Sequence, residues 1–119
     1  RILLVRHGYR RGWHFPGGGV ERFETLSQSL ARELEEEAGI VLDGAPSIFD
    51  IYAHFDAFPG DHIVLFVVRK WRQARVPSPN HEIAEHGFFA LDALPEGTTA
   101  QTRQRIAEIF LGQERRRDW

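Results

Sequence analysis

The sequence contains no cysteine, which excludes disulfide bonds, thiolate zinc sites and cysteine nucleophiles. Any bound metal must therefore be held by oxygen or imidazole ligands. No apolar run approaches the roughly 20 residues that a membrane-spanning helix requires, so we expect no membrane segment. A chain without cysteine fits a reducing compartment, and we expect a cytoplasmic location.

Methionine is also absent, and Arg1 stands directly before an apolar run. We therefore expect that further residues precede this N-terminus in the full protein. The 119 residues are enough to bury one hydrophobic core, so we expect a single domain over residues 1–119.

Neither sign of charge dominates the chain. It carries 15 basic and 17 acidic residues, a net charge of -2, so the overall field gives no clear indication of a nucleic-acid partner. The basic residues are arginines except for Lys70. Because the planar guanidinium makes paired contacts to phosphate, this bias leans towards phosphate chemistry.

The order of predicted elements indicates an α+β fold. Apolar and β-branched runs bounded by turn residues predict strands at residues 2–5, 48–54, 63–71 and 87–91. Helix-favouring runs predict helices at residues 25–38 and 99–117, with one further helical turn ending at residues 94–95. Residues 76–85 are expected to form a loop. We therefore expect an α/β/α sandwich, in which a mixed sheet lies between helices.

The predicted helix at residues 25–38 carries an acidic face. At about 100° per residue, Glu33, Glu36 and Glu37 cluster beside the apolar stripe, whereas Glu35 points nearly opposite. Carboxylates at such spacing repel one another unless cations lie between them, and their oxygens suit Mg²⁺ or Mn²⁺. Taken alone, however, a run of glutamates is more often a solvated helix face.

The pattern around this helix is more specific than the charges. It consists of Gly18, five residues, Glu24, seven residues, Arg32-Glu33-Leu34, one residue, Glu36-Glu37, one residue and Gly39-Ile40. This pattern matches the Nudix box at each specified position, so the chain resembles the Nudix hydrolase family of MutT-like proteins. The resemblance covers most of the chain and implies a Nudix-type α/β/α sandwich.

The resemblance implies roles for the residues that match the box. Glu36 and Glu37 would bind the catalytic metal, with Glu33 as a further ligand or as the group that positions water. The carbonyl oxygen of Gly17 would supply another metal ligand. Arg32 would brace the carboxylates.

The remaining box positions imply supporting roles. Glu24 would support the loop and the helix, Gly18 would allow a tight loop, and Gly39 would end the helix. In the family the general base is a glutamate of the box or of a later loop, which leaves Glu33, Glu82 and Glu85. Of the two loop candidates we favour Glu85, which lies three residues before a predicted strand.

Residues outside the box must bind the substrate phosphates and base. Arg6, Arg10 and Arg11 precede the glycine run and are candidate phosphate ligands, and Trp13 is a candidate for stacking on a base. For any one of these arginines a scattered surface position is at least as good an interpretation, and aromatic residues next to strands are more often part of the core. His7 and His14 lie near the expected mouth of the site, and no role is assigned to them.

The resulting prediction is a Mg²⁺-dependent hydrolase, with Mn²⁺ as an alternative ion. It would cleave the diphosphate linkage of a nucleoside diphosphate joined to another moiety, by attack of water on phosphorus. The substrate would be a nucleotide-type small molecule, and a homodimer is compatible with the resemblance.

The alternative is a non-catalytic Nudix-fold module that binds or senses a nucleotide or RNA. The arginines at residues 115–117 suggest a role with RNA, but such a run at a chain end is more often a solubilising tail.

Overall fold

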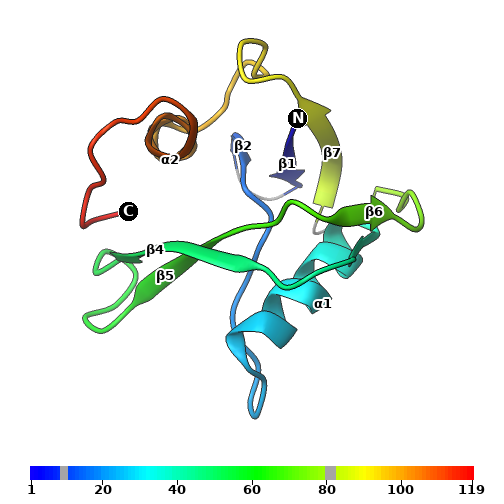
Figure 1. Cartoon of the computed structure of the whole chain (residues 1–119), viewed down its shortest axis with the longest axis horizontal. Helices are drawn as coiled ribbons and strands as arrows, with labels where there is room; N and C mark the ends of the chain where they lie inside the picture. The colour runs from blue at the N-terminus through cyan, green and yellow to red at the C-terminus, as the bar shows by residue number, and fades with distance from the viewer. Residues whose placement is uncertain (9–10, 80–82) are drawn as a thin grey trace.

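The computed structural model describes residues 1–8, 11–79 and 83–119, in which strands alternate with two helices (Figure 1). The strands are β1 (Ile2–His7), β2 (Trp13–His14), β3 (Ile40–Leu42), β4 (Ser47–Ala53), β5 (His62–Val67), β6 (Trp71–Gln73) and β7 (Ile83–Phe89). The helices are α1 (Leu26–Ala38) and α2 (Ala100–Phe110). The predicted α+β class is confirmed.

The strands form three small sheets, with orders β2-β1-β7, β3-β6 and β4-β5. Every pairing between these named strands is antiparallel. Parallel pairing within the described ranges is limited to isolated bridges, Trp13 with Thr98 and Ala53 with Asp118. The predicted mixed sheet is thus divided into antiparallel pieces. The two helices lie on opposite sides of the strands in Figure 1.

Helix α1 agrees with the predicted range 25–38, and of the two possible N-terminal residues, Thr25 and Glu24, it is Thr25 that caps the helix. The Thr25 side chain accepts a hydrogen bond from the Gln28 amide, and the Gln28 side chain accepts one from the Thr25 amide. This reciprocal pair is a capping box, which satisfies two amides that would otherwise lack partners. At the other end Gly39 adopts φ 66°, a left-handed conformation that favours glycine, and its amide bonds to Glu35.

The apolar stripe of α1 packs against the sheet that contains β1 and β7. Leu34, Ala38 and Ile40 form a buried cluster, and Leu3 of β1 and Phe88 of β7 pack against it. Burial of these side chains orients the helix. The polar face of α1 is therefore presented beside the sheet, which positions the carboxylates of the box.

Two predicted strands have different bounds in the structure. The prediction at residues 63–71 is wrong in its extent, because β5 ends at Val67 and Trp71 begins the separate strand β6. Strand β6 pairs with the unpredicted strand β3. The predicted strand at residues 87–91 instead spans β7 from Ile83, because this segment pairs along the whole of β1. Glu85 consequently lies in a strand rather than in the expected loop.

The C-terminal predictions also require correction. Residues 91–97 contain turns and no helix, and α2 ends at Phe110 instead of extending to residue 117. The tail after α2 lies along β4, where the Ala53 amide donates to the Arg117 carbonyl and the Trp119 amide donates to the Ala53 carbonyl. Arg115 stacks on the Phe49 ring at 3.9 Å. The arginine run therefore belongs, at least through Arg115 and Arg117, to a segment packed on the fold.

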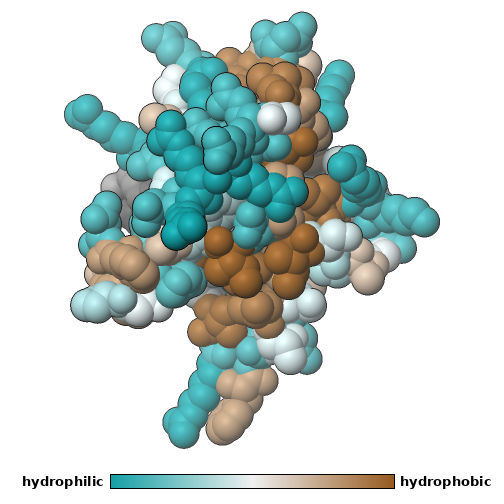
Figure 2. All heavy atoms as spheres, turned by 60° about the vertical axis from the view of Figure 1, so that its left-hand side comes forward, coloured by the Kyte–Doolittle hydropathy of each residue, from teal (hydrophilic) through white to brown (hydrophobic). Residues whose placement is uncertain are grey.

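No helix in the described part of the chain is long and apolar enough to cross a membrane. Some large apolar side chains are nevertheless exposed, including Ile48 and Ile51 of β4 and Phe110 and Leu111 at the end of α2. Figure 2 likewise shows hydrophobic surface between hydrophilic regions on the face that it views. Such mixed surfaces are normal for folded proteins, since there are too few polar atoms to cover them.

Candidate functional site

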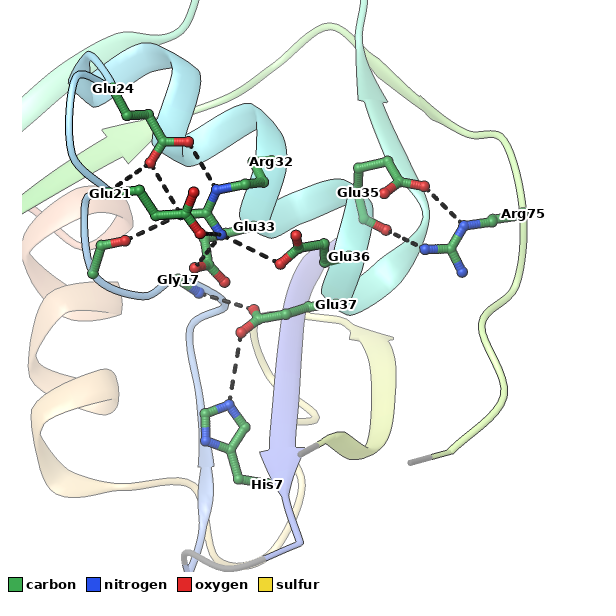
Figure 3. A network of polar contacts seen from close by, with 11 residues as sticks. His7, Gly17, Glu21, Glu24, Arg32, Glu33, Glu35, Glu36, Glu37 and Arg75 are labelled. Atoms are coloured by element: carbon green, nitrogen blue, oxygen red, sulfur yellow. Dashed lines mark hydrogen bonds and ion pairs between the residues drawn. The ribbon is translucent and has the colours of Figure 1, made fainter. Parts of the chain in front are cut away.

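Arg32 is the centre of a carboxylate network on α1 (Figure 3). Its guanidinium binds Glu24 twice, from Nε to Oε2 at 2.8 Å and from Nη2 to Oε1 at 3.0 Å. Its Nη1 atom donates to Glu33 Oε1 at 3.0 Å and to Glu36 Oε2 at 3.3 Å. Because both bonds meet at one nitrogen, Glu33 and Glu36 converge on the same side of the helix. Arg32 thus makes the bracing contacts that the family resemblance implies.

The Arg32 network also ties the preceding loop to the helix. Nη2 donates to the Gly19 carbonyl at 3.1 Å, and Nη1 lies 3.6 Å from Glu21 Oε1. The hydrogen bond from Arg32 lowers the pKa of Glu24 to about 2. The same bond raises the pKa of Arg32 above its ordinary value. Both groups are therefore charged at neutral pH, as a paired carboxylate and guanidinium require.

Glu37 is held separately from the Arg32 network. Its Oε2 atom accepts a hydrogen bond from the Gly17 amide at 2.9 Å, and its Oε1 atom lies 3.7 Å from Nε2 of His7 (Figure 3). His7 and Glu37 are both buried. The structure thus describes a role for the Gly17 N–H in holding Glu37, while the predicted role of the Gly17 carbonyl as a metal ligand stays a prediction.

The glycine loop approaches α1 very closely at Gly18. A β-carbon at this position would lie 2.7 Å from Cδ of Glu33, well inside van der Waals contact. Any side chain would therefore displace either the loop or the Glu33 carboxylate. Since Gly17 bonds to Glu37, consecutive residues of the loop contact two of the predicted metal ligands.

Oxygen donors from Glu33, Glu36 and Glu37 suit a hard divalent cation such as Mg²⁺ or Mn²⁺ in their chemistry. In the described parts of the chain, no group of three acidic or histidine side chains is already arranged around a common ion position. The contacts explain this, because Arg32 binds Glu33 and Glu36 while Gly17 binds Glu37. A cation at this site would therefore compete with Arg32 for two of its ligands.

Glu35 points away from the cluster, as the helical wheel predicts. Its carboxylate accepts a hydrogen bond from Nε of Arg75 at 2.9 Å, and its carbonyl accepts one from Nη2 of the same arginine at 2.8 Å. Figure 3 shows this pair on the side of α1 away from the Arg32 network. Glu35 therefore supplies a matched control for variants of the other glutamates.

The predicted substrate and base residues Arg6 and Glu85 face away from α1. They are direct partners across β1 and β7 and form an ion pair at 2.7 Å. Leu3 and Phe88, three residues away on the same strands, pack against the α1 cluster. Because successive side chains of a strand alternate between faces, Arg6 and Glu85 lie on the opposite face. The structure therefore separates Glu85 from the glutamates of the box.

Trp13 lies on the same face as Arg6, its partner across β1 and β2. The Trp13 ring contacts the Phe89 ring edge-on, with centroids 5.2 Å apart. Trp13 is thus engaged in packing, in line with the alternative interpretation that it is a core aromatic residue. Of the other candidates, Arg10 and Glu82 lie outside the described residues.

Two hollows adjoin these residues. A cleft of about 1020 Å³ is lined by the glycine loop and Glu33 on one side and by the apolar strand β5 on another. A shallower hollow of about 690 Å³ is lined by Arg6 and Arg11 together with glycines and Thr99. Only the first hollow is bordered by a box glutamate. It is the better candidate for a substrate that must reach the box.

The structure adds residues that the sequence did not assign. Glu21 and the Gly19 carbonyl join the Arg32 network, and His7 contacts Glu37. The contact of His7 with the helix could have been predicted from the alternation of side chains along β1. His7 shares its face with Leu3 and Val5, so a strand packed on the acidic helix by Leu3 directs His7 to the same helix.

The sequence and the fold are similar to those of known proteins. The model of the NUDIX domain matches residues 1–110. The crystal structure of a MutT NUDIX hydrolase from Burkholderia pseudomallei superposes with a TM-score of 0.73 at 32% identity, over 92% of this chain and 88% of that one. A UDP-X diphosphatase shares the fold, with a TM-score of 0.60 at 24% identity over 94% of this chain and 57% of that one.

Two curated relatives match parts of the chain. The 8-oxo-dGTP diphosphatase of Proteus vulgaris is 45% identical over 62 residues, which are 50% of this chain and 53% of that protein. The RNA pyrophosphohydrolase of Halorhodospira halophila is 35% identical over 77 residues, 65% of this chain and 33% of that protein. The chain thus spans about half or less of the length of these relatives.

Proposed function

The chain belongs to the NUDIX family, and from this membership we propose that it is a divalent-metal-dependent hydrolase of nucleotides. It would cleave the diphosphate linkage of a nucleoside diphosphate joined to another moiety. The observation that carries the proposal is Glu37, a carboxylate buried against the Gly17 amide and His7 on the same helix as Glu33 and Glu36.

We propose that Glu33, Glu36, Glu37 and the Gly17 carbonyl hold the ion, with Mg²⁺ preferred and Mn²⁺ as a substitute. When bound, such an ion neutralises the diphosphate and lowers the pKa of a water molecule. Arg32 keeps the carboxylates together before the ion arrives, and Glu24 holds Arg32. The glycine loop and α1 are thereby connected before the substrate binds.

Glu33 is the general base that the geometry supports best. Its side chain is 14% exposed and borders the cleft beside Gly18, whereas Glu85 lies on the other face of the sheet. In the proposed reaction a water oxygen attacks phosphorus, its proton passes to Glu33, and the phosphoanhydride bond breaks with the leaving phosphate taking the electron pair. The apolar wall formed by β5 would receive the nucleoside.

The experiment is a hydrolysis assay on a panel of nucleotides with Mg²⁺ or Mn²⁺. The panel includes the compounds that the names of relatives give, 8-oxo-dGTP, RNA and ADP-ribose, together with ordinary nucleoside triphosphates. The RNA is prepared with a 5′-triphosphate, so that it contains a phosphoanhydride bond. We expect release of phosphate, pyrophosphate or a nucleoside monophosphate from at least one member. Glu36→Gln should reduce the rate by at least about 100-fold, whereas Glu35→Gln should retain it.

A different outcome would support the alternative of a sensor module. Nucleotide binding without product release across the whole panel, in the wild type and with either ion, would contradict the proposed hydrolase. Equal losses in the Glu35 and Glu36 variants would contradict the assignment of the carboxylate cluster, because Glu35 binds only the Arg75 side of the helix in the contacts described.

A further inference from the structure

We propose that His7 is a positioning residue for Glu37. The imidazole and the Gly17 amide contact different oxygens of the Glu37 carboxylate, Oε1 and Oε2 respectively. Together they would fix the orientation in which Glu37 meets a divalent ion. This inference rests on the proposed metal-dependent function.

The backbone directs His7 towards this carboxylate. The register of β1 against β7 shifts between Arg6 and His7, so that Arg6 pairs with Glu85 and His7 pairs with Ile83. The unpaired residue, Ala84, lies in β7, so the alternation of β1 is kept and His7 points to the same face as Leu3, which packs against the α1 cluster. His7 is only 6% exposed and Glu37 only 7%, so the contact between them is shielded from water.

A second histidine supports the first from behind. Nδ1 of His14 lies 2.9 Å from the Phe15 carbonyl, which can only accept, so this nitrogen carries a proton. The His14 ring meets the His7 ring edge-on, with centroids 4.5 Å apart and an interplanar angle of 85°. The rotation of the His7 ring is therefore restricted. His14 also lies three residues before Gly17. The segment from His14 to Gly17 therefore contacts His7 at one end and Glu37 at the other.

Burial explains why a polar partner is needed at this position. A carboxylate removed from water is costly unless polar groups surround it. The Gly17 amide serves one oxygen, and His7 lies beside the other. Groups that contact a metal ligand from behind in this way commonly change metal affinity by about 10–100-fold when they are replaced.

The test compares two conservative variants of His7. In His7→Gln the amide nitrogen falls near the position of Nε2, the atom that faces Glu37, whereas the shorter side chain of His7→Asn reaches only the position of Nδ1. His86→Asn is the matched control, because His86 lies on β7 next to β1 and contacts Gln73 rather than Glu37. Affinity for Mn²⁺ alone is measured by calorimetry, and thermal unfolding is recorded without metal.

We expect His7→Asn to weaken Mn²⁺ binding by about tenfold, His7→Gln to stay within about threefold of the wild type, and His86→Asn to leave the affinity unchanged. The amide resonance of Gly17 should shift in metal-free His7→Asn, because the carboxylate that accepts its hydrogen bond loses its second contact.

Equal Mn²⁺ affinity in the wild type and His7→Asn would overturn the inference. Equal weakening in His7→Asn and His7→Gln, with the same fall in unfolding temperature and an unchanged Gly17 resonance, would also overturn it, since this indicates general packing. If the wild type binds no Mn²⁺ and hydrolyses nothing, the failure lies in the proposed function. If His7→Asn does not fold, the apolar variant His7→Leu takes its place, and Mn²⁺ affinity equal to that of the wild type then contradicts the inference.

Discussion

Arg105 of α2 is the largest fully buried side chain in the described structure, and its replacement by methionine should destabilise the fold strongly. Its Nε atom lies 3.1 Å from Glu108 Oε2, and both side chains are almost completely buried. Its guanidinium stacks on Tyr52 at 4.4 Å and on Trp119 at 5.1 Å, and it donates to the carbonyls of Asp118 and Trp119. Methionine fills similar space but removes the charge.

The expected loss follows from the charge that remains. Glu108 also accepts from the Tyr52 hydroxyl at 2.7 Å and from Gln104 at 3.0 Å. Burial alone would raise the pKa of Glu108, but these hydrogen bonds and the charge of Arg105 lower it below its ordinary value. Arg105→Met therefore leaves a buried anion without its cation, which costs about 3–5 kcal/mol. In a domain whose unfolding free energy is about 5–15 kcal/mol, this is a large fraction.

A double-mutant cycle in urea, followed by tryptophan fluorescence, tests this reasoning. Glu108→Gln keeps acceptors for Tyr52 but removes the anion, so the double variant should lose at least about 1 kcal/mol less than the sum of the single losses. Arg115→Met is the control, because its ion pair with Asp50 is half exposed, and it should lose less than about 1 kcal/mol. A loss below about 1 kcal/mol for Arg105→Met, or additive losses, would refute the argument.

Further predictions concern α1 and the loop before it. The pKa of Glu24 falls from 4.5 to about 2 in the folded protein, so its pairing with Arg32 stabilises the folded state above pH 4.5. This stabilisation is lost as the pH falls through 2. Glu24→Gln should therefore flatten a plot of unfolding free energy against pH in this range. Thr25→Ala removes the helix cap and should cost about 1 kcal/mol in urea unfolding. Gly18→Ala should weaken Mn²⁺ binding by about tenfold, whereas Gly19→Ala, whose β-carbon meets nothing within 4 Å, should bind like the wild type.

The parts of the fold that were predictable from sequence depend on local interactions. Helix α1 is specified by the Thr25 cap, by strong helix formers and by Gly39, all within one short segment. Its acidic face follows from helical geometry, including the outward direction of Glu35. The strands β1 and β4 are close to their predicted bounds for the same reason, since each is one apolar run between turn residues.

The wrong predictions depend on pairing between distant segments. Strand β7 begins at Ile83 because β1 lies beside it, and nothing in the polar run before Ile83 indicates that partner. The division between β5 and β6 likewise depends on the pairing of Trp71 with Leu42 in β3. Arg105 shows the same limit, since an arginine in an amphipathic helix is expected at the surface. Its burial requires Glu108 together with a tail that returns along β4.

The candidate site also changes what the acidic run by itself implies. Repulsion among three carboxylates was the sequence argument for a bound cation, but Arg32 already supplies a positive charge between Glu33 and Glu36. Electrostatic relief alone therefore does not require a metal ion. Glu37 carries the stronger physical argument, because it lies beyond these contacts and is buried against Gly17 and His7. An ion that binds Glu37 would draw Glu33 and Glu36 from Arg32, which Glu24 would continue to hold through two hydrogen bonds.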